Sequence, residues 1–258
     1  MKSVAGYVKR KSMLYKTDVE YGDYTMNHVQ GCAHGCLYPC YAYLMARRFG
    51  KVKGIEEWQS PYLVENTLDL LKKELPKLRS KIKSVHLCFT TDPFMYGYPE
   101  IAAMSVNAIK EINSAGLPCS VLTKGCLPAG LSLLSRENTY GITLITLDDD
   151  FRKQIEPHAA PTRRRITALR NLATLGCKTW VSIEPYPTPN IHRQNLKTIL
   201  DEISFVDKII FGRANYNTAV SKYPGCKTFF NEQAQLVIDY CTEHGIDYHI
   251  KDGTITRM

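Results

Sequence analysis

No run of apolar residues in this chain is long enough to cross a membrane, which takes about 20 consecutive, predominantly apolar residues. Residues 1–16 lack the apolar segment of a secretory signal peptide. The sequence also lacks internal repeats, low-complexity tracts and any linker rich in proline, glycine and serine. These absences argue against a membrane-spanning or exported protein. They predict a soluble, cytoplasmic protein that folds as a single domain over residues 1–258.

Acidic residues are fewer than basic ones, with 25 Asp and Glu against 33 Lys and Arg, so the formal net charge is +8. A basic surface permits an anionic partner such as nucleic acid, but it is also typical of an enzyme whose charge has no role in binding. Hydrophobic residues make up 44% of the chain, which is enough for a large core.

Nine cysteines in a chain without an export segment indicate a reducing compartment rather than a disulfide framework. Three of them, Cys32, Cys36 and Cys40, lie within nine residues, and no second group has such short spacing. Three thiolates can hold three irons of a [4Fe–4S] cluster and leave the fourth iron open to a ligand. The alternative is a structural zinc site with His34 as fourth ligand. It fits less well, because zinc ligands usually come in two pairs separated by a long loop.

Short runs with strand character alternate with amphipathic helical patterns. The predicted strands are 24–29, 85–89, 119–123, 142–146, 179–183 and 208–211, with 248–250 as a last edge strand. The predicted helices are 63–75, ended by Pro76, and 101–115, 163–175 and 232–243. Strict alternation predicts an α/β fold with a parallel sheet and right-handed crossovers. We expect a partial (β/α)6 TIM-like barrel with its core at roughly residues 22–215, completed by 216–258.

Each of the six main strands is followed by polar or special residues. These are Gly31-Cys32, Thr90 to Pro93, Lys124 to Cys126, Leu147 to Asp150, Glu184-Pro185 and Gly212 to Asn215. In barrels the chemistry gathers where strands end and the following loops begin. The pattern therefore predicts an enzyme with its site on one rim.

The cysteine loop at the end of the first strand, followed by Tyr41-Ala42, resembles the radical SAM superfamily, and more narrowly the branch that includes spore photoproduct lyase. Further stretches that fit are Thr91 to Phe94, Val121 to Lys124, Thr146 to Asp148, Glu156-Pro157 and Arg163 to Arg165. The resemblance spans roughly residues 22–190.

The resemblance implies a [4Fe–4S] cluster held by Cys32, Cys36 and Cys40, with S-adenosylmethionine chelating the open iron through its amino and carboxylate groups. One electron from the cluster, supplied by a donor such as flavodoxin or ferredoxin, then releases a 5′-deoxyadenosyl radical that abstracts hydrogen from the substrate. The protein positions and shields these cofactors.

The cysteine spacing departs from the family pattern, C-x3-C-x2-C with an aromatic residue just before the third cysteine. This chain has C-x3-C-x3-C, in which Pro39 follows Tyr38 as an extra residue. Proline stiffens the loop and removes one backbone donor that could reach a cluster sulfur. We expect an altered cluster environment rather than loss of the cluster, with Tyr38 close to the cofactor.

Polar residues after the second and third strands are candidates for the cofactor pocket. Thr91 and Asp92 offer a hydroxyl and a carboxylate, which suit the ammonium group of S-adenosylmethionine. Lys124 could meet its carboxylate or ribose. The alternatives are a polar turn closed by Pro93 and a solvated lysine on the rim.

Arg163, Arg164 and Arg165 begin a predicted helix, where cations oppose the helix dipole, so one of them should have an anionic partner. Spacing relative to Leu169 and Leu172 favours Arg165 as the inward one. The implied partner is the methionyl carboxylate, because a guanidinium clamps a carboxylate through two hydrogen bonds. At least one of the three is expected to be merely solvated.

Ser182 and Glu184 share one face of the fifth strand, opposite Val181 and Ile183. If that face is the barrel lumen, Glu184 contacts the ribose or the substrate. The alternative is an ordinary carboxylate at a strand end. Asp148 to Asp150 are expected to cap the next helix.

The remaining cysteines and tyrosines do not identify a catalytic residue. Cys88, Cys119 and Cys177 lie among apolar residues and are expected to be small core residues. Candidates for a radical relay, which the sequence does not rank, are Tyr96, Tyr98, Tyr216 and Cys226.

The substrate class stays open between alternatives. We favour a small molecule or peptide, because no DNA-binding hairpin or added domain is recognisable. Nucleic-acid repair or modification is the second hypothesis, supported by the charge and by tyrosines that could stack on bases. A non-catalytic iron–sulfur or zinc protein ranks third.

Overall fold

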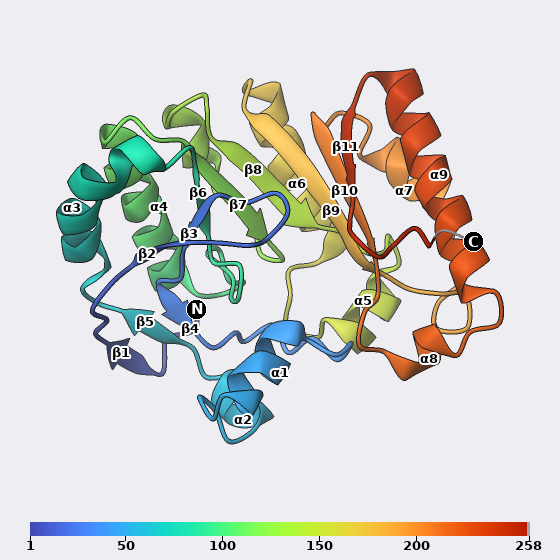
Figure 1. The fold of residues 1–258 in the computed structure, drawn as a ribbon, viewed down its shortest axis with the longest axis horizontal. Coiled ribbons are helices and arrows are strands. Elements are labelled where there is room, and N and C mark those ends of the chain that lie inside the picture. The colour runs from blue at the N-terminus through green and yellow to red at the C-terminus, as the bar shows by residue number, and fades with distance from the viewer. Residues whose placement is uncertain (257–258) are drawn as a thin grey trace.

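The computed structural model, which describes residues 1–256, is built around an eight-stranded sheet (Figure 1). Its strands are β2 (Leu14–Lys16), β3 (Tyr24–Met26), β6 (Val85–Leu87), β7 (Cys119–Thr123), β8 (Thr139–Thr143), β9 (Lys178–Tyr186), β10 (Lys208–Arg213) and β11 (Asp247–Ile250). They lie in the order β11-β10-β9-β8-β7-β6-β3-β2. All neighbouring pairs are parallel except β2 with β3. The α/β class with a parallel, partial-barrel sheet is confirmed.

The helices run mainly along the outer face of this sheet (Figure 1). They are α3 (Thr67–Leu78), α4 (Pro99–Ser114), α5 (Asp149–Ile155), α6 (Thr162–Thr174), α7 (Leu196–Glu202), α8 (Thr218–Ser221) and α9 (Cys226–His244). Short 3₁₀ turns occupy Arg79–Lys81 and Ala129–Leu133. Two further helices, α1 (Tyr41–Arg48) and α2 (Ile55–Trp58), follow the cysteine loop. A small second sheet pairs β1 (Gly6–Val8), β5 (Tyr62–Val64) and β4 (Val29–Gln30) in the order β1-β5-β4.

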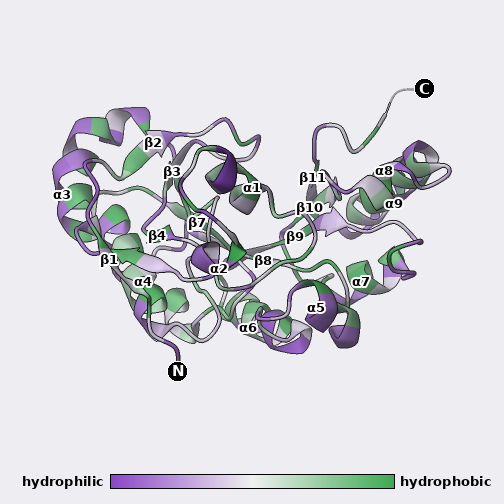
Figure 2. Ribbon diagram, turned by 90° about the horizontal axis from the view of Figure 1, so that it is seen from below, coloured by the Kyte–Doolittle hydropathy of each residue, from purple (hydrophilic) through white to green (hydrophobic). Residues whose placement is uncertain are grey.

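Alternation along the strands separates an apolar outer face from a mixed inner face. Val181 and Ile183 of β9 belong to the main hydrophobic cluster under the helices, whereas Trp180 and Ser182 face the other way. Figure 2 shows hydrophobic residues along the central strands and the inner stripes of the helices. Burying a side chain such as Ile183 contributes about 1.5–3 kcal/mol, so this outer face supplies most of the cohesion. The inner face is left for other groups.

A hairpin tip joins the two edges of the sheet. Glu20, in the loop between β2 and β3, pairs with His249 (Oε2 to Nε2, 2.6 Å) and with Lys251 (Oε1 to Nζ, 3.3 Å) at and after β11. Tyr21, next to it, packs edge-on against Trp180 with ring centroids 5.9 Å apart. The hairpin thus links β11 to the opposite edge of the sheet and covers part of its inner face.

Several predicted boundaries were wrong. The first predicted strand, 24–29, is divided into β3 and β4, which belong to different sheets. The last helix begins at Cys226 rather than at 232. The fourth strand is 139–143 rather than 142–146, because pairing of Ser120 with Thr139 and of Thr143 with Ser182 fixes its register. The first helix begins at Thr67, since 62–64 form β5. That helix also continues through Pro76 to Leu78. Pro76 is exposed, so the carbonyl that its missing N–H leaves free can reach water.

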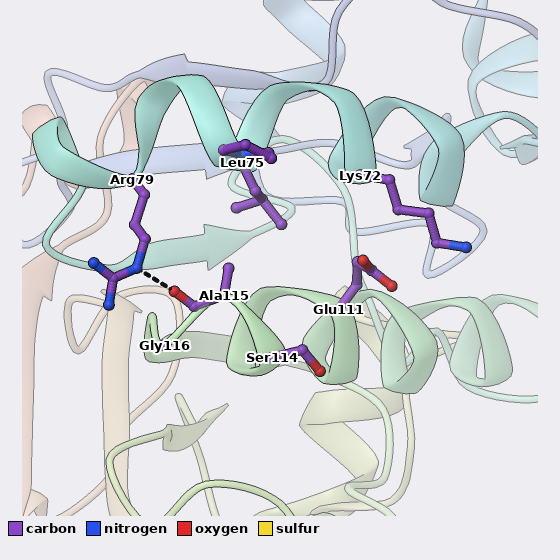
Figure 3. A pocket seen from close by; sticks show the side chains of 8 residues that line it. Lys72, Leu75, Arg79, Glu111, Ser114, Ala115 and Gly116 are labelled. Atoms are coloured by element: carbon purple, nitrogen blue, oxygen red, sulfur yellow. Dashed lines mark hydrogen bonds between the residues drawn. The ribbon is translucent and has the colours of Figure 1, made fainter.

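A groove of about 520 Å³ lies between α3 and α4 (Figure 3). Arg79 spans it and donates from Nε to the carbonyl of Ala115 (2.6 Å), which satisfies an acceptor at the end of α4. Its lining is made of helix surface residues, and it shares none of them with the cavity described next. We regard it as a helix-packing groove.

Candidate active site

A cavity of about 450 Å³ lies at the carboxyl ends of the parallel strands. Residues of β9 and the loops after β4, β6, β7, β10 and β11 contribute to its lining. It is lined by nine of the ten predicted site residues: Cys32, Cys36, Tyr38, Cys40, Thr91, Asp92, Lys124, Ser182 and Glu184. Five of the six predicted strand ends meet at this rim, because parallel strands in register present their ends at the same edge. The exception is Leu147 to Asp150, which do not line the cavity; Asp148 caps α5 instead, as the sequence predicted.

Backbone contacts pin the cysteine loop in place. Gly31 has a φ of +81°, and a Cβ there would lie 2.6 Å from the carbonyl oxygen of Trp58. The N–H of Cys32 donates to that same oxygen at 2.7 Å, and the N–H of Leu37 donates to Ile155 at 2.8 Å. Glycine before the first cysteine therefore allows the chain to approach closely and turn.

The three clustered thiols are unpaired and face one cavity, which fits a [4Fe–4S] cluster. Within residues 1–256, no three Cys, His, Asp or Glu side chains are close enough together to hold a single metal ion. A closed zinc site is thus not formed by the described residues.

His34, the considered fourth zinc ligand, is held elsewhere. It is 1% exposed, and its Nε2 accepts a hydrogen bond from the N–H of Tyr96 at 3.1 Å. Its Nδ1 lies 3.5 Å from Oδ2 of Asp92. Burial lowers the pKa of His34 to about 4, so the ring is neutral at physiological pH.

A buried carboxylate, Glu156, connects the cysteine loop to the barrel. Its Oε1 accepts from the hydroxyl of Tyr38 at 2.7 Å, and its Oε2 accepts from Nη2 of Arg165 at 2.7 Å. Nζ of Lys124 lies 3.7 Å from Oε1. Burial by itself raises the pKa of Glu156, but Arg165 and Lys124 hold it below its usual value. The sequence singled out Glu156-Pro157 only as a matching stretch and did not assign Glu156 to the site.

Tyr38 lies at the cavity wall beside the cluster cysteines. It lines the cavity together with Cys36, and its hydroxyl donates to Glu156. Burial raises the pKa of Tyr38 well above its usual range, so it stays a neutral donor. A chain of contacts therefore runs from Tyr38 through Glu156 to Arg165.

Arg165 differs from its predicted role. It points inward as expected, with 1% of its surface exposed, but it does not line the cavity. Its guanidinium donates to the carbonyls of Ala160 (2.8 Å) and Thr143 (2.9 Å) and to Glu156. The anion that a cation at this helix start requires is Glu156, which the helical pattern could not reveal. Within the protein, Arg165 thus already has its anionic partner.

Asp92 is also engaged within the protein. Its Oδ1 accepts from the N–H of Phe94 (2.9 Å) and the hydroxyl of Thr123 (2.6 Å), and its Oδ2 accepts from the N–H of Lys124 (2.7 Å). These bonds tie the ends of β6 and β7 together. Nδ1 of His34, 3.5 Å from Oδ2, is a fourth polar neighbour of this carboxylate. Thr91 donates weakly to the carbonyl of Val29 at 3.3 Å.

The opposite side of the cavity carries a carboxylate with looser surroundings. Glu184 packs over Gly212, where a Cβ would lie 2.9 Å from its carboxyl carbon and 3.0 Å from a side-chain carbon of Lys251. Burial raises the pKa of Glu184, and the charges of Lys251 and Lys124 only partly oppose this. Ser182 lies on the same face of β9, so the predicted shared face does point into the lumen.

The structure adds lining residues that the sequence did not indicate. Cys88 is buried as predicted, but it also lines the cavity, with a φ of +63° and its Sγ 3.4 Å from Nδ1 of His28. His86, another lining residue, has an Nδ1 without a hydrogen-bond partner among residues 1–256. Of the four relay candidates, Tyr216 lines the cavity, whereas Tyr96, Tyr98 and Cys226 do not. A short strand of mixed residues gives no sequence pattern that would reveal such inward positions.

Comparison with protein families matches residues 26–203 to the radical SAM superfamily. An uncharacterized protein from Acidianus two-tailed virus is 28% identical over 188 residues, covering 70% of this chain and 61% of that protein. An uncharacterized protein from Methanocaldococcus jannaschii is 28% identical over 182 residues, covering 69% and 66%. The chain thus spans less than two thirds of the length of these relatives.

Among solved structures, a spore photoproduct lyase variant with bound AdoMet and dinucleoside spore photoproduct has a TM-score of 0.66. The match covers 95% of this chain and 80% of that one at 12% identity. SuiB of Streptococcus suis bound to S-adenosylmethionine matches with a TM-score of 0.52 and 16% identity, covering 70% and 42%. At these identities the likeness shows a shared fold. Over the described residues, no helix has both the length and the apolar character needed to span a membrane.

Proposed function

This chain belongs to the radical SAM superfamily, and we propose that it uses a [4Fe–4S] cluster on Cys32, Cys36 and Cys40 to cleave S-adenosylmethionine reductively. The observation that carries the proposal is the convergence of the three thiols and the polar strand ends on one cavity. When bound, cluster and cofactor together would supply a 5′-deoxyadenosyl radical that abstracts hydrogen from a substrate.

The residues of the chain would bind, orient and shield the cluster and S-adenosylmethionine. We assign Thr91 and Asp92, which both line the cavity, to the ammonium group of the cofactor. Lys124 offers a cation for the carboxylate group of the cofactor. It lines the cavity, and its Nζ, which lies 3.7 Å from Glu156, can turn toward the cavity. Glu184 and Ser182 are assigned to the ribose or the substrate.

The contacts behind the cysteines fix the loop that carries them. Glu156 holds Tyr38, which lines the cavity together with Cys36. Partners of this kind, one layer behind the metal ligands, orient the ligands and tune the metal group. The extra Pro39 is accommodated in a loop that still places Cys40 on the cavity wall.

For the substrate we propose a small molecule or peptide as the first class. The cavity of about 450 Å³ also has to hold the cofactor, so a compact group of the substrate would enter it. An electron donor such as flavodoxin or ferredoxin is required as partner. Nine unpaired thiols support a reducing compartment, which we propose to be the cytoplasm.

Nucleic acid is the second substrate class, and one observation favours it. Tyr216 at the cavity mouth is 73% exposed, and Arg213 lines the same mouth, so an aromatic ring and a cation are available to a base and a phosphate. The whole-length likeness to spore photoproduct lyase concerns the fold and is compatible with either class.

Anaerobic reconstitution tests the proposal. We expect about four irons and four sulfides per chain, an EPR signal that changes on adding S-adenosylmethionine, and 5′-deoxyadenosine after reduction by dithionite. A reconstituted chain that holds a single zinc ion, or that forms no 5′-deoxyadenosine, contradicts it. Binding to single-stranded DNA with a steep dependence on salt concentration would move the second substrate class to first place.

A further inference from the structure

The helix after the third cysteine, α1, buries small residues and exposes large ones. Its buried positions are Ala42 and Ala46, which pack against Trp58. Four large apolar side chains of this segment are between 40% and 66% exposed: Leu37, Leu44, Met45 and Phe49. A surface helix normally turns its large apolar residues toward the core. Contiguous exposed apolar side chains of this kind mark interaction sites.

The same segment is strongly basic. Arg47, Arg48, Lys51 and Lys53 are all exposed, and the sequence has no acidic residue between Ala33 and Gly54. We call these four cations, together with the four exposed apolar side chains, the α1 face. Acidic residues return only at Glu56 and Glu57, and Glu57 accepts from the N–H of Lys53 at 2.6 Å.

The α1 face covers the cysteine site from outside. Cys40 is the N-cap of α1. Cys32 and Cys40 are partly buried against the same small cluster that holds Ala42, Ala46 and Trp58. The inner side of the helix thus contacts two of the three cluster ligands, while its outer side meets solvent.

We infer that the α1 face is the docking surface for a small acidic protein electron carrier, an inference that rests on the proposed function. In the docked complex the reduced carrier gives up one electron and the oxidised cluster takes it, with no atom transferred between the two proteins. Cations around an apolar centre suit a partner that presents acidic side chains around an exposed redox group. Interfaces for electron transfer are small, below about 1,200 Å² in total, so a short helix with its flanks is sufficient.

Two other partners fit the α1 face less well. Nucleic acid would pair with the four cations, but its phosphates would leave Leu44 and Met45 uncovered. An anionic membrane would take both the cations and the apolar side chains. Neither alternative accounts for the position of the face directly over the cysteines.

The test compares two ways of reducing the reconstituted protein. Arg47→Glu/Arg48→Glu reverses two charges on the α1 face, and Lys73→Glu/Lys77→Glu makes the same charge change on exposed positions of α3. Reduction of the cluster is followed by absorbance with reduced flavodoxin as the carrier probe and, separately, with dithionite. Binding of oxidised flavodoxin is measured as Kd at several salt concentrations.

At low salt we expect the α1 variant to lose about tenfold or more in the flavodoxin rate constant and in affinity, while the α3 variant stays within about twofold of the parent. Reduction by dithionite should be the same in all three proteins. Met45→Ser/Phe49→Ser should weaken flavodoxin binding without changing its salt dependence. High salt should remove most of the difference between the parent and the α1 variant.

Equal losses in the α1 and α3 variants would overturn the docking assignment. So would an α1 variant that keeps its flavodoxin rate but loses binding to anionic vesicles or to single-stranded DNA. Failure of the parent to form 5′-deoxyadenosine with dithionite would instead count against the proposed function. The two failures are therefore distinguishable.

Discussion

The two walls of the cavity satisfy their charges in different ways. The cluster wall comprises the cysteine loop with Tyr38 and Lys124, and the far wall comprises Ser182, Glu184, Arg213, Tyr216 and Lys251. Directly behind the cluster wall, Glu156 and Arg165 are 0% and 1% exposed and are joined at 2.7 Å. On the far wall, Glu184 is partly exposed, and its pKa is raised because burial is only partly offset by nearby lysines.

The difference indicates that the charges behind the cluster wall are paired before a ligand binds, whereas the charge on the far wall is not fully compensated. A buried ion pair with its hydrogen bonds filled holds its neighbours in one geometry. A carboxylate whose charge is poorly compensated gains most when a ligand brings hydrogen-bond donors. The cluster wall is thus suited to orient a permanent cofactor, and the far wall to receive a group that comes and goes.

The largest expected effect is the loss of the cluster in Cys40→Ala. Removing one of three ligands should lower the iron content far below about four per chain and abolish formation of 5′-deoxyadenosine. Iron and sulfide analysis with EPR measures this. Cys126→Ala, at a half-buried cysteine that does not line the cavity, is the matched control and should keep its iron. Cofactor cleavage at the parent rate in Cys40→Ala would show that Cys40 is not a ligand.

Glu156→Gln should be the most destabilising change among the charged residues. It leaves Arg165 buried without its anionic partner, which costs about 3–5 kcal/mol of unfolding free energy. Urea unfolding under anaerobic conditions provides the measurement. Glu156→Leu/Arg165→Met should recover part of the loss, because it removes both charges. A Glu156→Gln protein as stable as the parent would mean that this pair does not hold the cluster wall together.

Glu184→Gln, the same substitution on the far wall, should separate binding from stability. We expect its unfolding free energy to stay within about 1 kcal/mol of the parent, since the charge is poorly compensated in the folded state. Affinity for S-adenosylmethionine or turnover should fall about tenfold, because a carboxylate acceptor is lost. Calorimetric titration with S-adenosylmethionine measures the affinity. Unchanged binding and unchanged turnover would remove Glu184 from the site.

The smallest expected effect concerns the hairpin tip that links the sheet edges. Burial by itself raises the pKa of Glu20, but its bonds to His249, to the N–H of Asp252 and to Lys251 bring it below the usual value. A lowered folded-state pKa contributes stability above the unfolded-state pKa of about 4.3, and this stability is lost as the pH falls below that value. The parent should therefore exceed Glu20→Gln by about 0.5–1 kcal/mol at pH 7, and this difference should shrink progressively as the pH falls below about 4. Parallel unfolding curves from pH 3 to pH 7 check this, and a constant difference would exclude the carboxylate charge as its cause.

Much of the fold could be predicted because it follows from local patterns. The six main strands and the helices at 101–115 and 163–175 were located from apolar periodicity alone. Errors arose where pairing with neighbouring strands sets the boundary of an element. An example is β8, whose ends are set by pairing with β7 and β9. The exposed Pro76 was tolerated inside α3 because solvent could satisfy the carbonyl that its missing N–H leaves free.

In the candidate site, too, local sequence patterns predicted some features and missed others. Cysteine spacing and the strand-end rule led to nine residues that share one cavity, because both depend on positions close in sequence. Arg165 was predicted to point inward and does so, but the sequence did not reveal its partner within the protein. That carboxylate, Glu156, sits nine residues earlier at the end of α5, before a loop whose path the sequence pattern did not define.

By itself, then, the sequence determined the class of fold, the three-thiol loop and the rim on which the chemistry gathers, since each follows from short-range spacing. Only the tertiary structure decided which charges meet. Glu20 and His249 are 229 positions apart, and Tyr38 and Glu156 are 118 apart. That α1 buries small residues and exposes large apolar ones also became clear only from the packing of Ala42 and Ala46 on Trp58. Long-range contacts depend on how the whole chain packs, and no local pattern encodes them.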